Sequence, residues 1–330
     1  MTQHAGAQGG LAAPAGCGFF LVGATASGKT AVAHCLAEQL GGEILSADSM
    51  LVYAGMDIGT AKPDAAARRR VRYHGLDLTT PDQPFSVGRY LASVRLSLAD
   101  SPAARTPRPE GGLLVAGGTG LYARALTQGL ADAPPANPSV RAYWTDVLEE
   151  QGLEPLQAEL QRRSPGLYGA LADPQNPRRL IRALELAAAG LGRREPTWAA
   201  AAPSAPLAGL RRAPEDLNRR IEERVRAMFR GGFVDEVRVL QARWPQTSET
   251  ARQAIGYAEA RAYLAGALSL AQAEEQTVIR TRQLAKRQRT WFAHQADVRW
   301  IDAAPDEPAE SLARRVLEHW RTHGPTALRC

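Results

Sequence analysis

The stretch that decides the fold reads Gly23-Ala24-Thr25-Ala26-Ser27-Gly28-Lys29-Thr30, which satisfies the pattern G-x-x-x-x-G-K-[ST] of a phosphate-binding loop. An apolar segment from Gly18 to Gly23 precedes the loop and an apolar-periodic segment from Lys29 to Leu40 follows it, so we expect a strand, a loop and a helix. The glycines allow backbone N–H groups to converge on an anion, and the helix N-terminus adds the positive end of its dipole. We expect residues 23–30 to bind a diphosphate or a nucleotide, with Lys29 at the terminal phosphate and the Thr30 hydroxyl on Mg²⁺. The alternative is an ordinary glycine-rich turn.

Strands and helices alternate through the N-terminal part of the chain. A short strand is expected at Glu43–Leu45, shortly before Asp48, and a helix is expected from Ser86 to Ala99. A third strand, Leu113–Ala116, stops at Gly117-Gly118-Thr119-Gly120. Such alternation predicts a parallel sheet whose ligand site lies at the carboxyl ends of the strands. We therefore predict an α/β fold, a P-loop NTPase-like parallel sheet flanked by helices, with an all-helical insertion domain.

The pattern changes after Leu130, where prolines mark a boundary and only helical signals follow. Helices are expected at Val140–Gln151, Pro155–Arg163 and Pro177–Ala189, and the Ala/Pro stretch Ala199–Gly209 is expected to be a linker. Helices at Pro214–Gly231 and Leu270–Ala293 then return the chain to the main body. The predicted division is a tail at 1–17, a discontinuous P-loop core at 18–131 and 207–302, a helical insertion at 132–206, and a C-terminal helix and tail at 303–330.

Composition and charge limit the class of protein. Hydrophobic residues make up 45% and charged residues 22% of the chain, which is ordinary for a globular protein with a sizeable core. The net charge of +6 suggests a polyanionic partner without identifying it. The three cysteines show neither metal-ligand nor disulfide spacing, the N-terminal segment lacks a signal-peptide pattern, and no apolar run is long enough to span a bilayer. We therefore expect a cytoplasmic protein with no membrane segment.

The strand ends bear on what happens to the bound phosphates. A hydrolytic P-loop ATPase usually has an apolar strand ending in an Asp that holds Mg²⁺ and positions water. Here the strand Leu113–Ala116 ends in glycine, which disfavours the ATPase interpretation. Asp48 does follow a strand, and the residues alone fit a general base and a helix-capping or loop carboxylate equally well.

Five blocks of sequence, in order, resemble the bacterial tRNA dimethylallyltransferases, also called isopentenyl-tRNA transferases. The first runs from Asp48-Ser49-Met50-Leu51 to Ala61-Lys62-Pro63. The later blocks are GGTGLY at Gly117–Tyr122, RALE at Arg182–Glu185, QAIGY at Gln253–Tyr257 and TRQLAKRQRTWF at Thr281–Phe292. The resemblance covers roughly residues 19–302, and the ordered set is far more specific than the P-loop, which many enzymes share.

The resemblance implies transfer of a dimethylallyl group from dimethylallyl diphosphate to N6 of the adenosine 3′-adjacent to the anticodon of tRNA. Diphosphate is the leaving group, so the P-loop and Mg²⁺ would stabilise the charge that develops on it. Asp48 would be the general base that takes a proton from the adenine amino group, a role typically worth about 10²–10⁴-fold in rate. Thr119 would contact the backbone beside the base or the leaving oxygen, unless it is a structural turn residue.

The resemblance also places arginine near the diphosphate, at Arg220 and Arg224 on one helix face. A guanidinium fork suits phosphate oxygens. The alternative is a surface ion-pair face with the acidic residues Glu222, Glu223 and Asp216. Asp57 and Lys62 are interpreted as a solvated loop pair.

The family's helical insertion grips the anticodon stem, and a cationic helix that ends in Trp291 and Phe292 suits RNA. The candidate tRNA contacts are Asp48, Ser49, Met50, Leu51, Thr119, Arg141, Arg178, Arg179, Arg182, Arg282, Lys286 and Arg287. For each arginine of the insertion, a solvated helix charge is an equally good interpretation, and Trp291 and Phe292 are expected to pack in the core. The expected partners are the tRNA anticodon stem-loop and dimethylallyl diphosphate, the expected cofactor is Mg²⁺, and the expected state is a monomer.

Three places depart from the family pattern. One is Tyr73-His74-Gly75-Leu76-Asp77, which stands for a His-His-Leu-Ile-Asp-like stretch and is given no catalytic role. Ala24 stands where family P-loops usually carry Pro, and Ala54 stands where Arg is frequent, but neither removes a residue that the chemistry needs. Two other functions stay open. A P-loop kinase of small molecules or nucleosides would leave the Asp48 block unexplained, and a non-enzymatic or ATP-driven RNA-binding protein would not explain a phosphate loop together with a carboxylate.

Overall fold

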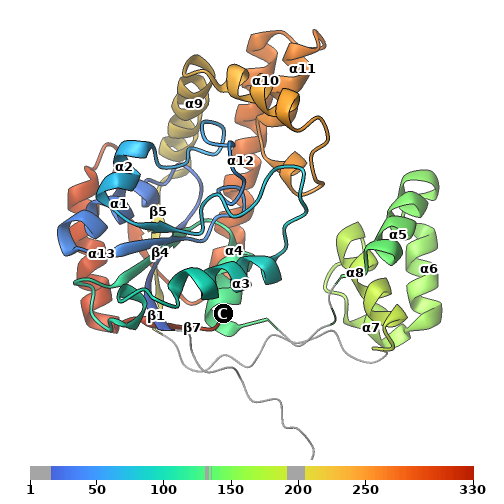
Figure 1. Ribbon diagram of the computed structural model, residues 1–330, viewed down its shortest axis with the longest axis horizontal. Coiled ribbons are helices and arrows are strands. Elements are labelled where there is room, and N and C mark those ends of the chain that lie inside the picture. Colours follow the sequence, from blue (N-terminus) through green and yellow to red (C-terminus); the bar gives the residue numbers. More distant parts are fainter. Residues whose placement is uncertain (1–15, 131–133, 135, 192–204) are drawn as a thin grey trace, which may run out of the picture. The chain divides into compact units, whose positions relative to one another are not determined.

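The computed structural model describes residues 16–130, 134, 136–191 and 205–330, and Figure 1 shows its ribbon. The chain divides into two compact units. The larger unit comprises Met1–Gly129 and Ala202–Cys330, and the smaller one comprises Leu130–Ala201. The smaller unit is therefore inserted into the sequence of the larger one.

A seven-stranded sheet forms the centre of the larger unit. Its strands are β1 (Gly16–Gly23), β2 (Glu43–Ser46), β3 (Tyr73–His74), β4 (Leu113–Gly117), β5 (Leu207–Arg211), β6 (Val298–Asp302) and β7 (Thr326–Leu328). The order is β3-β2-β4-β1-β5-β6 with all these pairs parallel, while β7 pairs antiparallel with the start of β1. Val22 pairs with Gly117, and Ser46 pairs with Ala116, so β1, β2 and β4 end at the same edge. The predicted α/β fold with a parallel sheet is confirmed, and the edge where these strands end carries the P-loop.

Helices cover both faces of this sheet (Figure 1). The helices of the larger unit are α1 (Lys29–Leu40), α2 (Ala65–Arg70), α3 (Val87–Leu98), α4 (Gly120–Gln128), α9 (Pro214–Arg230), α10 (Phe233–Arg243), α11 (Tyr257–Leu264), α12 (Leu270–Gln295) and α13 (Ala309–His323). Of these, α10 and α11 pack on each other and on α9 and α12. On one face α1 packs against α13, where Leu36, Val316 and Trp320 are buried against β1. The Trp320 indole N–H donates to the carbonyl of Phe20 at 3.0 Å, which fixes α13 to the central strand. None of the described helices combines the length and the apolar composition needed to cross a membrane.

Three segments predicted as tails or linker are strand. Gly16 and Cys17 were placed in the N-terminal tail, yet they begin β1 because they pair with Leu328 and Ala327 of β7. The same pairing turns part of the C-terminal tail into strand. The end of the predicted linker, residues 207–209, belongs to β5, while its earlier residues 199–204 lie outside the described part. Each of these segments is a strand because it pairs with a strand that is distant in the sequence, so its local sequence pattern did not predict it.

The smaller unit is helical wherever it is described. It consists of α5 (Pro138–Gln151), α6 (Glu154–Arg163), α7 (Pro165–Ala170) and α8 (Pro177–Ala188), which confirms the three helices predicted here and adds the short α7. Leu156, Leu160 and Leu184 are fully buried in a core of its own. The apolar face of α8 packs into that core. The Asn176 side chain caps the first turn of α8.

Candidate active site

The loop between β1 and α1 has the backbone of an anion cradle. Gly28 caps α1 at φ +96°, a left-handed conformation that glycine adopts without steric cost. Ala26 lies at φ +62°, in the same region but with a Cβ atom. Left-handed residues in such turns point successive backbone N–H groups towards one point, where an anion binds. The loop geometry therefore fits the binding of phosphate groups that the sequence predicts.

Replacing Ala26 by Gly is expected to raise the free energy of unfolding by about 0.5–1 kcal/mol. The left-handed backbone costs an L-residue about 1–2 kcal/mol, and the greater freedom of glycine in the unfolded chain offsets part of the relief. Urea unfolding followed by circular dichroism measures the change. Ala31→Gly is the matched control, because Ala31 is exposed in α1 and the same exchange there is expected to lower stability by about 1 kcal/mol. A loss of stability in both variants would contradict the strain at Ala26.

Four cationic side chains surround the cradle. The Lys29 side chain is 8% exposed, and its Nζ donates to the carbonyl of Ala24 at 3.1 Å. Three arginines that follow β5 donate the remaining hydrogen bonds. Arg212 donates to the carbonyl of Ser27 at 2.9 Å, and Arg220 donates to the carbonyl of Ala26 at 3.1 Å. Arg224 donates to Thr25 Oγ1 and to the carbonyl of Thr60, both at 3.3 Å. Positive charge therefore converges on the P-loop from α1 and from α9.

The surface ion-pair alternative for the two predicted arginines is wrong. Neither Arg220 nor Arg224 forms an ion pair with a carboxylate of the described residues, and both point to the P-loop. Their neighbour Arg219 takes the surface role instead, and it pairs with Asp216, Glu223 and Asp306. One helix thus presents an ion-paired face to solvent and a cationic face to the cradle.

The electrostatics of the cradle link Lys29 to Asp48. Burial lowers the pKa of Lys29 to about 8, an effect that the charge of Asp48 opposes and the charge of Arg224 strengthens. Burial likewise lowers the pKa of Arg224, again opposed by Asp48. Lys29 forms no ion pair with any described carboxylate. Two cations and one carboxylate therefore share a neighbourhood in which positive charge is incompletely compensated, and an anionic ligand would compensate it.

Asp48 and Thr119 lie on adjoining loops after β2 and β4. Asp48 Oδ1 accepts a hydrogen bond from the N–H of Met50 at 3.0 Å, which fixes the carboxylate on its loop. The Thr119 hydroxyl accepts from the N–H of Ser49 at 2.9 Å and donates to Ser49 Oγ at 3.2 Å. Thr119 therefore holds the loop that carries Asp48, and no described residue forms a hydrogen bond with the second oxygen of Asp48.

The loop that follows Asp48 is anchored by a buried lysine. Lys62 was interpreted as one half of a solvated pair with Asp57, but it is 8% exposed. Its Nζ lies 2.7 Å from both Asp57 Oδ1 and Asp77 Oδ1, and it donates to the carbonyl of Tyr53 at 2.7 Å. The predicted pair with Asp57 is therefore present, but its lysine is buried rather than solvated, because the ammonium has carboxylate and carbonyl partners that allow its burial. Lys62 is thus structural, in contrast to Lys29.

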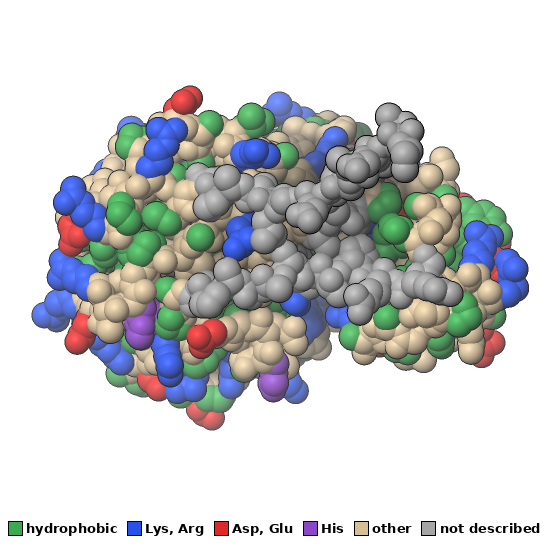
Figure 2. All heavy atoms as spheres, turned by 90° about the horizontal axis from the view of Figure 1, so that it is seen from below, with side chains coloured by type: hydrophobic (Ala, Val, Ile, Leu, Met, Phe, Trp, Pro, Cys, Tyr) green, Lys and Arg blue, Asp and Glu red, His purple; other side chains and the backbone are tan. Residues whose placement is uncertain are grey.

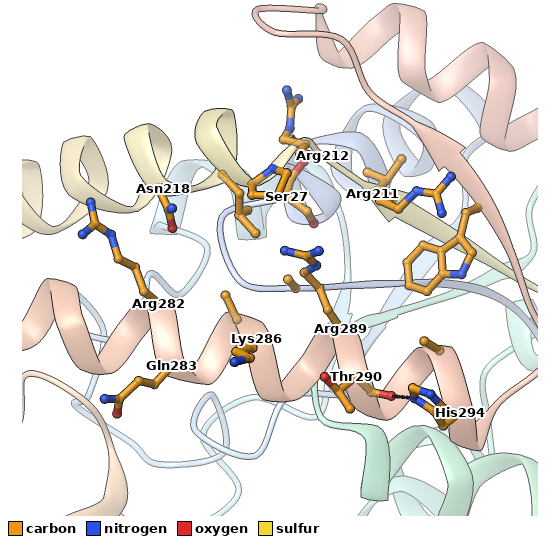
Figure 3. Close-up of a pocket in the computed structure, with 17 residues that line it drawn as sticks. Ser27, Arg211, Arg212, Asn218, Arg282, Gln283, Lys286, Arg289, Thr290 and His294 are labelled. Carbon is orange, nitrogen blue, oxygen red and sulfur yellow. Dashed lines mark hydrogen bonds between the residues drawn. The ribbon is translucent and has the colours of Figure 1, made fainter.

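A cationic pocket of about 650 Å³ opens on the other side of the P-loop (Figure 3). Its lining includes Ala24 and Ser27 from the loop, Arg211, Arg212 and Asn218 near β5, and Arg282, Gln283, Lys286 and Arg289 from α12. No Asp or Glu is among its lining residues. Arg282 pairs with Glu222, whereas Lys286 and Arg289 form no ion pair with a described carboxylate. Asp48 and Thr119 do not line this pocket; they lie after β2 and β4, across the P-loop from it.

The sequence did not mark Arg212 as a site residue, and the reason is local. Arg212 follows β5 directly, and β5 itself was not predicted as a strand. Its side chain also pairs with Asp216 at 2.8 Å, so it supports the P-loop from a buried ion pair. Only the pairing of β5 with β1 brings it to the loop.

The residues predicted to contact tRNA have varied surroundings. Arg141 and Arg182 both pair with the buried Glu185, while Arg178 and Arg179 are exposed at the start of α8. On the face that Figure 2 shows, Lys and Arg side chains are spread among apolar side chains rather than gathered in one patch. Their contacts with tRNA stay predictions.

Trp291 and Phe292 pack against each other at the end of α12. Phe292 is fully buried, and the Trp291 ring contacts it edge-on with centroids 5.0 Å apart. Trp291 also lies against Gly120, where a Cβ atom would approach the ring to 2.2 Å. Core packing is therefore confirmed for Phe292, whereas Trp291 is half-buried and packs on Phe292 and Gly120.

Fold and site together define a P-loop NTPase-like protein in which a cationic phosphate cradle and an aspartate share one edge of a parallel sheet. The model of the family described as IPP transferase matches residues 51–295, and the chain belongs to this family. It is therefore an enzyme, a prenyltransferase, and the resemblance found in the sequence is confirmed.

Similar proteins agree with this assignment. The chain is 43% identical over 302 residues to a tRNA dimethylallyltransferase of Anaeromyxobacter sp. (strain K), covering 90% of this chain and 96% of the relative. It is also 43% identical over 295 residues to a tRNA dimethylallyltransferase of Thermus thermophilus, covering 87% and 93% of the two chains. Among solved structures, the tRNA isopentenylpyrophosphate transferase of Bacillus halodurans is similar with a TM-score of 0.62 at 31% identity, over 92% of this chain and 97% of that one.

Proposed function

We propose that this enzyme transfers the dimethylallyl group of dimethylallyl diphosphate to N6 of the adenosine 3′-adjacent to the anticodon of tRNA and releases diphosphate. The observation that carries the proposal is the buried Lys29, which has no carboxylate ion pair among the described residues and shares its surroundings with Asp48. A buried ammonium without an ion pair is stabilised by an anion that binds next to it, and the nearby Asp48 can act as a base. The names of the relatives support the same reaction.

The cradle acts on the leaving group. As the C–O bond to the prenyl group breaks, negative charge grows on the departing diphosphate. Lys29, Arg220 and Arg224, which contact the P-loop, and backbone N–H groups of that loop would surround this charge. Fixed donors of this kind stabilise a transition state without reorganising during the reaction. The same residues bind the diphosphate before reaction, so the loop holds phosphates without needing to position water.

We expect Mg²⁺ to be coordinated jointly by protein oxygens and by the diphosphate. The described residues contain no cluster of three or more His, Cys, Asp or Glu side chains that could hold a metal on its own. Mg²⁺ commonly takes one or two protein oxygens and completes its shell with phosphate oxygens and water. Thr30, at the exposed start of α1, would supply one such oxygen. The ion would add positive charge beside the diphosphate.

Asp48 acts on the acceptor. The adenine amino group is a poor nucleophile because its lone pair is delocalised into the ring. We infer that the free carboxylate oxygen of Asp48 accepts one amino proton as the C–N bond forms, while its other oxygen stays bound to the Met50 N–H. Thr119 fixes this loop through Ser49. The target base would leave its stack to reach the carboxylate.

The helical unit and the exposed cations of α12 are proposed to bind the tRNA. Arg178 and Arg179 in the insertion and Lys286 and Arg287 on α12 are exposed, so they are the better candidates for phosphate contacts. Arg141 and Arg182 are weaker candidates because Glu185 binds both. Ser49, Met50 and Leu51 are partly exposed beside Asp48, where the flipped base would arrive. With tRNA as substrate, the proposed site of action is the cytoplasm.

One incubation tests the reaction directly. The protein is mixed with Mg²⁺, dimethylallyl diphosphate labelled in the prenyl group and unmodified tRNA, and label is followed into tRNA and then into N6-modified adenosine after digestion. Transfer supports the proposal. Phosphorylation of a small molecule or nucleoside from ATP, with no transfer of the prenyl label, would replace it with the kinase alternative.

The affinity for dimethylallyl diphosphate is expected to fall as pH rises above about 8. Lys29 carries a proton below its pKa of about 8 and loses it above, so the free protein then offers the diphosphate one positive charge fewer. The expected loss approaches tenfold per pH unit while the bound form keeps its proton. Titration calorimetry in buffers of different ionisation enthalpy measures the affinity and the proton taken up on binding. Lys29→Met is expected to take up no such proton.

A further inference from the structure

Gln288 connects the two loops on which the proposed reaction depends. It lies on α12, which runs past the loop that carries Ser27 (Figure 3). Its side-chain oxygen accepts a hydrogen bond from the N–H of Thr25 at 2.8 Å, and its side-chain nitrogen donates to the carbonyl of Gly118 at 2.9 Å. One carboxamide therefore bridges the P-loop after β1 and the glycine-rich turn after β4.

The bridge uses both halves of the amide and fits closely. A Cβ atom on Gly118 would lie 2.5 Å from the Gln288 side-chain nitrogen, so any larger residue at position 118 would displace the carboxamide. The P-loop offers a donor and the turn offers an acceptor. A carboxamide satisfies both, whereas a carboxylate can only accept and a thioether does little of either.

The connection continues from the turn to the proposed base. Thr119 follows Gly118 in the chain, and its hydroxyl holds the N–H of Ser49, the neighbour of Asp48. Movement of Gly118 relative to Thr25 would therefore displace Asp48 relative to the P-loop. In a reaction between two bound groups, a misplacement of about 1 Å can cost about 10²-fold in rate.

We propose that Gln288 is a positioning residue that sets the separation between the diphosphate held by the P-loop and the Asp48 that receives the adenine proton. The roles of the two loops rest on the proposed function, whereas the bridge itself exists without substrate. Gln288 acts through backbone groups of the two loops and does not touch the reacting atoms. Removing it leaves each loop intact but loosens their relative position.

Steady-state kinetics of three variants test this role. Gln288→Met keeps the length and removes both hydrogen bonds, while Gln288→Glu keeps an acceptor for Thr25 and removes the donor to Gly118. Both are expected to lower kcat by about 30–100-fold. In Gln288→Met the KM for dimethylallyl diphosphate and the Kd for inorganic diphosphate are expected to stay within about threefold of wild type, whereas the negative charge that Gln288→Glu adds beside the P-loop is expected to weaken both. Gln276→Met, at an exposed position of the same helix, is the control and is expected to behave as wild type.

Two kinetic outcomes would overturn the proposal. One is a kcat within about threefold of wild type in a folded Gln288 variant. The other is a weakened diphosphate Kd with unchanged kcat, which would make Gln288 a support for the cradle alone. Gln288→Glu, which has nearly the same shape as the natural residue, keeps the test decisive if Gln288→Met does not fold.

Hydrogen exchange with inorganic diphosphate as the probe separates this inference from the proposed function. In the wild type, diphosphate is expected to slow amide exchange in residues 23–30 and also in residues 47–50 and 118–119. In Gln288→Met it is expected to slow exchange in residues 23–30 alone. Equal slowing of all three segments in both proteins would overturn the bridge. A wild-type protein that modified no tRNA would overturn the proposed function, and the exchange result would still decide the role of Gln288.

Discussion

Asp48→Asn is expected to lower the turnover of prenyl transfer by at least about 10²-fold while diphosphate binding is kept or strengthened. The amide oxygen of Asn can still accept the hydrogen bond from the Met50 N–H, so the loop keeps its conformation. What is lost is a carboxylate oxygen that can take a proton from the adenine amino group. Removing a negative charge from the neighbourhood of Lys29 and Arg224 also removes a repulsion of the diphosphate. Loss of turnover without loss of affinity therefore distinguishes a base from a binding group.

Single-turnover kinetics with preformed enzyme–tRNA complex and titration with inorganic diphosphate measure the two quantities separately. Asp100→Asn is the matched control, because Asp100 is exposed after α3 and the same chemical exchange there is expected to change neither quantity. Turnover of Asp48→Asn within about threefold of wild type would reject Asp48 as the base and would favour the interpretation as a loop carboxylate.

Lys29→Met is expected to weaken diphosphate binding by at least about 10²-fold and, at the same time, to stabilise the protein. Its ammonium is buried with a carbonyl as its hydrogen-bond partner, and its surroundings, burial above all, lower its pKa from 10.5 to about 8, so the charged form costs free energy in the folded protein. The difference corresponds to about 3 kcal/mol at pH 7. Methionine has a similar length and no charge, so it removes the cost together with the contact to the diphosphate.

The stability that Lys29→Met gains depends on pH, because the pKa of Lys29 is lower in the folded than in the unfolded protein. Below pH 8 both the folded and the unfolded wild type carry the proton on Lys29, and the full cost is present. Between pH 8 and 10.5 only the unfolded chain keeps the proton, so wild-type stability rises with pH and the advantage of Lys29→Met shrinks. Urea unfolding at about pH 7 and about pH 10 without ligand measures both effects.

Lys62→Met is the matched control for this lysine. Lys62 is equally buried but pairs with Asp57 and Asp77, so its removal is expected to destabilise the protein by about 3 kcal/mol. Substitution by Met is thus expected to raise the free energy of unfolding at Lys29 and to lower it at Lys62. A loss of stability of similar size in both variants would show that Lys29 has a structural partner after all, and it would remove the main observation behind the diphosphate cradle.

The difference between these two lysines was not visible in the sequence. Both stand in a chain that is poor in lysine, and the sequence identified Lys29 by its position in the P-loop. Lys62 was interpreted as solvated because no neighbour in the sequence marks it as buried. Asp77, the partner that allows its burial, is 15 residues away and is brought to it by the fold of the loop after β2. The partners of a buried charge decide its role, and partners are a property of the tertiary structure.

By itself, the sequence determined the P-loop motif, the parallel α/β class and the predicted helices of the insertion, because each rests on local periodicity or on fixed spacing within a motif. The residues proposed for the reaction came from the family resemblance, since Asp48 alone fitted a base and a loop carboxylate equally well. Only the tertiary structure decided what joins them. β5, β6 and β7 are short and became strands through pairing with distant partners. Arg212 and Gln288 reach the P-loop from positions 185 and 263 residues away from their hydrogen-bond partners. Contacts over such separations depend on how the whole chain packs, and no local pattern encodes them.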